Sequence, residues 1–149
     1  MIFSRTFLVI NTMLLLSQPS ISSLVAWNQI GADIDGEAAD DYTGWSVSLS
    51  NDGNIVAIGA RYNDANGSNS GHVRVYTFDS TSSQWNQMGS DIDGEAVDDT
   101  SGFSVSLSNN GNVVAIGSPY DDSNGSNSGH VRVFRNDLTL EPTLSPSRY

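Results

Sequence analysis

Cysteine and lysine are absent from the sequence, and histidine occurs only twice. The lack of cysteine excludes a thiol nucleophile, although it leaves the redox compartment undecided. Six arginines, scattered along the chain, stand against 17 acids and give a net charge of −11. Binding to nucleic acid needs arginine or lysine side chains clustered on the phosphates, so the composition predicts that nucleic acid is not a partner.

A hydrophobic run long enough to span a membrane is also missing, because the extended apolar stretch covers only residues 7–16. Arg5 precedes this stretch and the small-residue segment QPSISS follows it, which is the layout of a secretory signal peptide. We therefore predict a signal peptide at residues 1–23, followed by a mature chain without a membrane span that is secreted or held at the cell surface. An uncleaved anchor and an apolar N-terminal strand are the alternatives.

What the sequence does contain is a tandem repeat with an offset of 58 residues. Residues 27–79 align with residues 85–137 without a gap, and 38 of the 53 positions are identical. Agreement over this length at one offset indicates a duplicated structural unit. We assign the first repeat to residues 27–84 and the second to residues 85–135. The proline- and serine-rich remainder, residues 136–149, is expected to be a disordered linker or tail.

Each repeat has four segments with the character of short β-strands. The clearest is WSVSLS at residues 45–50, where Trp45, Val47 and Leu49 alternate with serines. An Asp-Gly pair follows and predicts a tight hairpin to the apolar run at residues 54–60, which we expect to be buried on both faces. The other two segments are residues 27–31 and 72–78, and the second repeat has its four at residues 85–89, 103–108, 112–118 and 130–136.

Four antiparallel strands in each period, with glycine at the turns and no helical periodicity, are typical of a β-propeller blade. We predict an all-β fold of two such blades, in which the bulky face of one blade packs on the serine face of its neighbour. The tryptophans Trp27, Trp45 and Trp85 are expected at blade interfaces. The second blade lacks its last strand, so the propeller is incomplete. A β-solenoid is the main competing architecture.

The strand motifs carry a resemblance to a known family. Gly44-Trp45 and Gly102-Phe103 precede the alternating strands, and AIGAR and AIGSP follow after the hairpin. This order resembles the FG-GAP repeat of integrin-alpha-type propellers, and the segment WNQIGADIDGE is similar to secreted relatives with a WxQxGxDIxGE motif. The resemblance covers residues 27 to about 135. It implies a propeller blade and an extracellular adhesive or ligand-binding role.

Two acidic nonapeptides, DIDGEAADD at residues 33–41 and DIDGEAVDD at residues 91–99, raise the question of calcium. The resemblance places the family's calcium loop between two strands, where this chain has only the short turns at residues 51–54 and 109–112. Such turns cannot offer the six or more oxygens that Ca²⁺ prefers, and the nonapeptides lack the spacing of an EF-hand loop. We predict no metal site and no cofactor. Calcium in the nonapeptides, or in the Asn-rich loops at residues 62–71 and 120–129, is the alternative.

Catalytic residues are not expected. His72 and His130 occur once in each repeat, so no histidine pair is expected to converge within a copy. No G-x-S-x-G motif is present. A glycosidase needs two carboxyls in environments that separate their pKa values, and acids crowded into one polar loop give no sign of this. The sequence therefore predicts that the chain is not an enzyme.

Asn66-Gly67-Ser68 and Asn124-Gly125-Ser126 match the acceptor pattern for N-glycosylation. On a eukaryotic secretory route both asparagines would be candidate glycosylation sites. In a bacterium the same residues would form only a turn.

Together the observations predict a non-catalytic extracellular binding or adhesion module whose ligand is an extracellular protein or glycan. Two alternatives stay open: a truncated fragment of a larger cell-surface propeller, and a secreted lectin or carbohydrate-active enzyme. Two blades are fewer than the roughly four to eight of closed propellers. We therefore predict a homo-oligomer of two to four subunits, in which residues 27–31 of one copy pair with the strand starting at His130 of the next.

Overall fold

The fold is given by a computed structural model that describes residues 26–137. The predicted signal peptide, and the predicted tail from residue 138 onward, lie outside the described residues. Within residues 26–137 all named elements are β-strands, and no helix there is long and apolar enough to cross a membrane. The predicted all-β fold is confirmed.

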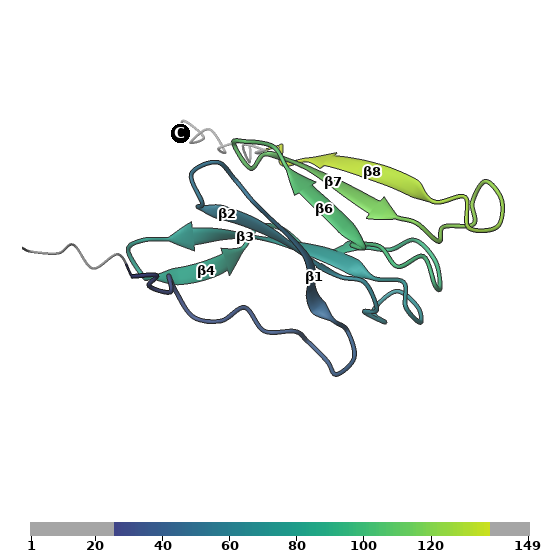
Figure 1. Cartoon of the computed structure of the whole chain (residues 1–149), viewed down its shortest axis with the longest axis horizontal. Coiled ribbons are helices and arrows are strands. Elements are labelled where there is room, and N and C mark those ends of the chain that lie inside the picture. The colour runs from purple at the N-terminus through teal and green to yellow at the C-terminus, as the bar shows by residue number, and fades with distance from the viewer. Residues whose placement is uncertain (1–25, 138–149) are drawn as a thin grey trace, which may run out of the picture.

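The two repeats form two antiparallel sheets (Figure 1). The strands of the first sheet are β1 (Thr43–Leu49), β2 (Ile55–Ala60), β3 (His72–Asp79), β4 (Gln84–Gln87) and β5 (Ile92–Asp93). Their order is β1-β2-β3-β4, and β5 pairs with the start of β3. The second sheet contains β6 (Ser104–Leu107), β7 (Val113–Ser118) and β8 (His130–Arg135), in that order. Strands β4 and β5 belong to the second repeat in sequence, so the start of the second repeat completes the first blade.

Asp52 closes the hairpin between β1 and β2. Its Oδ1 accepts hydrogen bonds from Ser50 Oγ at 2.6 Å and from the Asn54 amide at 3.1 Å. Gly53 has a φ of +73°, a left-handed conformation that glycine adopts without steric cost. The hairpin predicted from the Asp-Gly pair is therefore confirmed.

The two sheets contact each other through β1 and β2 of the first blade and β6 of the second. Ser46 Oγ donates to the Gly102 carbonyl at 2.7 Å, and Ser48 Oγ accepts from the Leu107 amide at 2.9 Å. A side chain at Gly59 would collide with the backbone of Gly102. The serine face of the first blade is thus covered by the second blade, as the alternation predicted.

The main hydrophobic core lies between the blades. Ala57 and Val73 of the first sheet pack with Val114 and Ile116 of the second, and all four are buried. Val105 and Leu107, on the bulky face of β6, pack against this core. Burial of each large aliphatic side chain contributes about 1.5–3 kcal/mol, so this shared core holds the two blades together.

A smaller core lies on the opposite face of the first sheet. It consists of Val56, Ile58 and Tyr76, and it is covered by Ile34 and Trp85. The indole of Trp85 also packs on Phe78, with 5.2 Å between the ring centroids. Trp85 therefore fills the side of the first blade that faces away from the second.

Three expectations are wrong at the open sides of the two blades. Residues 27–31 form no strand, and Trp27 is fully exposed instead of filling an interface. Val47 and Leu49 are 64% and 59% exposed, because no described residue covers the bulky face of β1. Strand β2 is buried from Val56 to Ala60, as expected of residues 54–60, but its counterpart β7 alternates between buried and half-buried positions. In each case the covering blade that the pattern anticipates is absent from the described part of the chain.

Candidate functional site

Loops of the two repeats meet at one end of the sheets and form a polar groove. Residues 61–71 join β2 to β3, residues 119–129 join β7 to β8, and residues 94–103 lead into β6. The groove is lined by Tyr62, Asn69, Val97, Asp98, Thr100, Tyr120, Asp122 and Asn127. Equivalent positions of the two repeats, such as Tyr62 and Tyr120, therefore face one space.

Hydrogen bonds hold the walls of the groove in place. Asn69 Nδ2 donates to Asp98 Oδ1 at 2.9 Å, and the Thr100 amide donates to the Asn69 carbonyl at 3.1 Å. The Asn69 amide in turn donates to Asp64 Oδ1 at 2.7 Å. The first two bonds join a loop of the first repeat to a loop of the second, so the shape of the groove depends on both.

The backbone of the groove is strained. Four lining residues have φ values between 51° and 64°: Asn69, Asp98, Thr100 and Asn127. Asparagine and aspartate tolerate this region, but a β-branched threonine adopts it rarely. Thr100 is only 4% exposed, and its Oγ1 has no hydrogen-bond partner among the described residues. The counterparts of Asp98 and Thr100 in the first repeat, Asp40 and Tyr42, have the same positive φ, so this backbone conformation belongs to the repeat unit.

A row of aromatic rings runs beside the groove and crosses from one repeat to the other. The Arg61 guanidinium lies 3.5 Å from the ring centroid of Trp45 and 4.2 Å from that of Tyr62. Trp45 in turn lies 5.9 Å from Phe103 of the second repeat. The remaining neighbours are Tyr42 with Trp45 at 6.5 Å, Tyr42 with Tyr62 at 5.4 Å and Phe103 with Tyr120 at 6.4 Å. Tyr42, Trp45 and Tyr120 are each about half exposed, so the row offers flat apolar faces to a ligand.

A histidine, a glutamate and an arginine come together once in each blade. His72 Nδ1 lies 3.9 Å from Glu37 Oε2 and 3.7 Å from Asp91 Oδ2, and Arg74 Nη1 lies 3.3 Å from Glu37 Oε1. Burial lowers the pKa of His72, while the carboxylates of Asp91 and Glu37 act in the opposite direction. In the second blade His130 Nδ1 lies 3.2 Å from Asp121 and 3.9 Å from Glu95, and Arg132 lies 3.6 Å from Glu95.

Both clusters have the residue types of a metal centre. Glu37, His72 and Asp91 in the first blade, and Glu95, Asp121 and His130 in the second, could hold a divalent cation. One nitrogen with carboxylate oxygens suits Zn²⁺ better than Ca²⁺. In each blade, however, an arginine already pairs with the glutamate and would repel a cation beside it. Each cluster therefore fits an ion-pair network, which in the first blade ties the acidic loop to β3. His72 and His130 lie in different clusters, so they do not form a pair.

Most carboxylates of the acidic nonapeptides accept hydrogen bonds from groups nearby, although Glu37 and Asp91 meet at His72 and Glu37 and Asp41 share the Asn63 amide. Asp33 accepts from Gln29 Nε2 at 2.8 Å, whereas Asp41 accepts from the Ala38 amide and from Asn63 Nδ2. Glu37 turns to the histidine and arginine described above. In the second repeat Asp91 accepts from Gln87 Nε2 and Asp99 from the Ala96 amide. Most of these bonds close turns, and a calcium loop would instead direct its oxygens to one point.

The two candidate glycosylation sites have different surroundings. Both asparagines are exposed. Asn66 Nδ2 nevertheless donates to the Gly94 carbonyl at 2.7 Å, which ties its side chain to the second repeat. Gly67, the next residue, lies against the side chain of Val97. Asn124 has no equivalent contact among the described residues, because no third repeat is present there.

Comparison with known families tests the resemblance noted in the sequence. Residues 32–78 and 91–134 both match the FG-GAP repeat. The chain belongs to the FG-GAP repeat family. The first matched segment contains β1, β2 and most of β3, and the second contains β5, β6, β7 and most of β8. FG-GAP repeats are typical of extracellular or cell-surface propellers with binding roles. No curated protein matches the chain.

Sequence patterns identified the repeat and the acidic loops but missed the groove of this FG-GAP chain. The groove forms where loops of two repeats meet, and alternation within one repeat carries no signal for such a contact. One signal was present: a tyrosine two residues after each AIGA or AIGS strand, at Tyr62 and Tyr120. The same ring at the same loop position in both repeats indicates a shared surface.

Proposed function

We propose that this FG-GAP repeat chain is a non-catalytic extracellular binding or adhesion module, and that the groove beside the aromatic row binds a neutral glycan. The observation that carries the proposal is the pair Tyr62 and Tyr120, which face one polar groove from two repeats. The extracellular setting rests on the predicted signal peptide and on the family.

The chemistry of the groove suits a sugar. Amides of Asn69 and Asn127 can donate and accept, and carboxylates of Asp98 and Asp122 accept from hydroxyl groups. Tyrosine rings supply apolar faces for stacking and hydroxyls for hydrogen bonds. The two acids and the net charge of −11 disfavour an anionic ligand. A neutral glycan suits the polar side chains, the tyrosine rings and the negative charge of the groove.

Binding without turnover is the expected activity. The two carboxylates on the groove already accept hydrogen bonds from its walls: Asp98 Oδ1 accepts from Asn69 Nδ2 at 2.9 Å, and Asp122 Oδ1 accepts from the Asn127 amide at 2.6 Å. FG-GAP repeats are a binding module. A lectin-like role is therefore favoured over a carbohydrate-active enzyme.

The test is binding of the secreted chain to an array of immobilised neutral and acidic glycans and matrix proteins, followed by calorimetry with the best binder. Tyr62→Ala and Tyr120→Ala should each weaken binding on the order of tenfold, which corresponds to about 1.4 kcal/mol. Thr81→Ala is the matched control, because Thr81 is exposed in the β3–β4 turn at the other end of the sheet. Its affinity should equal that of the unchanged chain.

Three outcomes would count against the proposal. Binding only to a matrix protein would replace the glycan by a protein ligand, and unchanged affinity in both tyrosine variants would move the site elsewhere. Release of shortened sugar from a bound oligosaccharide would make the chain an enzyme. Chromatography of the recovered oligosaccharide separates the last case from simple binding.

A further inference from the structure

We propose that Trp27 of one copy docks into an apolar cleft beside β8 of a second copy, so that chains associate head to tail. The inference does not depend on the ligand of the loop groove. It is based on the relation between the two repeats, because one repeat contains the filled form of the cleft and the other contains the open form.

The first blade shows the filled form. Trp85 of β4 covers Val56, Ile58 and Tyr76, and its Nε1 donates to the Ile30 carbonyl at 3.0 Å. Gly31 lies directly against this indole, since a Cβ built on it would come within 2.9 Å of Trp85 Cδ1. Trp85 thus seals the side of the first blade, next to a glycine that leaves room for it.

The second blade shows the open form. An apolar cleft there is lined by Met88, Gly89, Ile92, Val114, Phe134 and Asn136, among others. Four of these are the counterparts, 58 residues on, of Gly31, Ile34, Val56 and Tyr76 around Trp85. A Cβ built on Gly89 would meet no atom of the described residues within 4 Å, in contrast to Gly31. The described part of the second blade therefore lacks the indole that fills the first.

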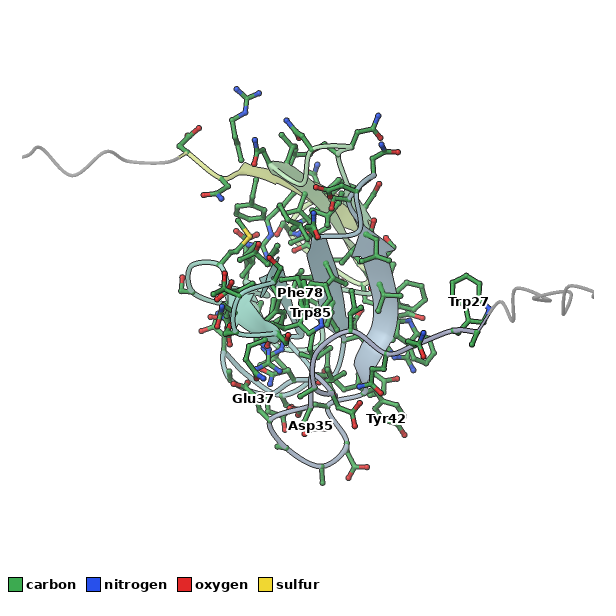
Figure 2. All side chains as sticks on the ribbon, turned by 90° about the vertical axis from the view of Figure 1, so that its left-hand side faces the viewer. Trp27, Asp35, Glu37, Tyr42, Phe78 and Trp85 are labelled. Atoms are coloured by element: carbon green, nitrogen blue, oxygen red, sulfur yellow. The ribbon has the colours of Figure 1, made fainter. Side chains whose placement is uncertain are left out.

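The exposed side chain of Trp27 from another copy is the group that we expect to fill this cleft. It lies 58 residues before Trp85 and shares the sequence WNQ with it. Its side chain is fully exposed, and Figure 2 shows it pointing away from the sheets, whereas Phe78 and Trp85 lie together against the first sheet. Seated in the cleft of another copy, Trp27 would have the environment of Trp85, with the Met88 carbonyl in the place of Ile30.

The strand edge beside the cleft fits the same partner. In the first blade β3 pairs with β4 at one end and with β5 at the other. Among residues 26–137, β8 pairs only with β7, so its outer edge is open. Residues 26–29 and 34–35 of a second copy are the counterparts of β4 and β5 and can fill that edge.

The exposed apolar faces at β8 and at β1 also fit each other. Val131 and Val133 are 68% and 64% exposed, while their counterparts Val73 and Val75 lie against the second blade. On the other side Val47 is exposed, while its counterpart Val105 packs in the core between blades. Each exposed face thus repeats a face that is buried within the chain, and a second copy can continue the same interface.

The proposed contact joins two different surfaces of the molecule, so it forms between two copies and not within one. The open face at β1 and the open face at β8 lie on opposite outer sides of the two-blade stack. Head-to-tail association closes into a ring when the rotation allows it. With closed propellers of about four to eight blades, the expected assembly has two to four subunits.

The first experiment measures the mass of the secreted chain by size exclusion coupled to light scattering. We expect a discrete assembly of two to four subunits. Trp27→Ala should give a monomer without loss of folding, because Trp27 is fully exposed. Trp27→Phe should retain the assembly in part, and Val97→Ala, which removes another exposed apolar side chain, should leave it intact. A monomer of the unchanged chain, or an assembly that persists in Trp27→Ala, overturns the proposal.

The second experiment tests the register of the proposed strand pairing. The chain has no cysteine of its own, so introduced cysteines can cross-link only with each other. Thr77 pairs with Asn86 between β3 and β4, and their counterparts in the proposed contact are Arg135 of one copy and Asn28 of the other. Oxidising a mixture of Asn28→Cys and Arg135→Cys chains should form a mixed disulfide dimer, because paired strand residues lie within disulfide reach. Thr81→Cys mixed with Asn28→Cys should not. Equal cross-linking in both mixtures overturns the proposed register.

Discussion

Asp52 and Asn110 close the two hairpins with the same hydrogen bonds, although only one of them carries a charge. Asp52 Oδ1 accepts from Ser50 Oγ and the Asn54 amide, and Asn110 Oδ1 accepts from Ser108 Oγ at 2.8 Å and the Asn112 amide at 3.1 Å. The repeat thus contains its own control for the contribution of a carboxylate.

The first prediction follows from this pair. The hydrogen bond from Ser50, and those from Asn54, lower the pKa of Asp52 from 3.8 to about 2. A lowered pKa means that the carboxylate stabilises the fold above the unfolded value, and that this contribution disappears as the pH falls from about 4 through 2. Asp52→Asn should therefore lose less stability than the unchanged chain over this interval. Thermal unfolding at pH 6, 4, 3 and 2 measures the difference.

Asn110→Asp is the reciprocal control. It places a carboxylate in the same hairpin geometry of the second repeat, so it should steepen the loss of stability below pH 4. Identical pH profiles for Asp52→Asn, Asn110→Asp and the unchanged chain would show that the hairpin does not depend on charge.

The second prediction concerns Gly59 at the blade interface. A methyl group at this position would collide with the Gly102 backbone of the other sheet, so Gly59→Ala should cost about 1–3 kcal/mol of unfolding free energy. At the equivalent Gly117 the obstacle is the rotatable hydroxyl of Ser104, and Gly117→Ala should cost less than about 1 kcal/mol. Urea unfolding of both variants makes the comparison. Equal losses would contradict the close contact at Gly59.

The third prediction is that calcium does not stabilise the chain. Asp33, Asp41 and Asp91 accept hydrogen bonds from Gln29, Asn63 and Gln87. The hairpins at residues 51–54 and 109–112 are too short for an oxygen cage. The unfolding temperature should therefore be the same with millimolar Ca²⁺ and with a chelator. Stoichiometric Ca²⁺ binding tighter than about 10 µM by calorimetry would refute this. Asp91→Asn and Asp98→Asn would then locate the site.

The fourth prediction concerns glycans. If the chain passes through a eukaryotic secretory pathway, a glycan on Asn124 should leave stability unchanged, because that side chain is exposed in the structure described for residues 26–137. A glycan on Asn66 must share the amide that binds the Gly94 carbonyl and should lower the unfolding temperature. Glycopeptide mass spectrometry of Asn66→Gln and Asn124→Gln chains gives the occupancy. Thermal unfolding before and after enzymatic removal of the sugar then measures each effect.

The residue patterns within each repeat were sufficient to predict most strands of the two blades. Alternation of Trp45, Val47 and Leu49 with serines fixed the faces of β1, and the Asp-Gly turn fixed its pairing with β2. The faces and the pairing of these strands depend on residues within one hairpin, so they can be predicted from the sequence alone.

The segments at Trp27 and Trp85 show where local pattern fails. Both begin WNQ, yet Trp85 lies in β4 and Trp27 lies in no strand. The difference comes from the preceding strand: β3 runs just before Trp85 and offers it an edge, and Trp27 has no such partner among the described residues. Strand formation depends on the paired edge, so equal sequences give unequal structures.

The polar groove could not be predicted from the sequence for a related reason. Its position depends on contacts between repeats, such as Asn69 with Asp98, and on the positive φ of Thr100. Neither follows from residue preferences, because threonine usually avoids that conformation. Tyr42, the counterpart of Thr100 in the first repeat, has a φ of +53°, so the loop of each repeat adopts this conformation by itself.

The serine face of one blade and the bulky face of the next come from the same 58-residue unit. Ser46 and Ser48 hydrogen-bond to the backbone of Gly102 and Leu107, and every repeat carries both halves of that contact. A gene that gains one more copy of the unit thereby gains a matching surface without any new mutation. The array can lengthen or shorten by whole blades during evolution, since its only junction is the one that the unit already makes with itself.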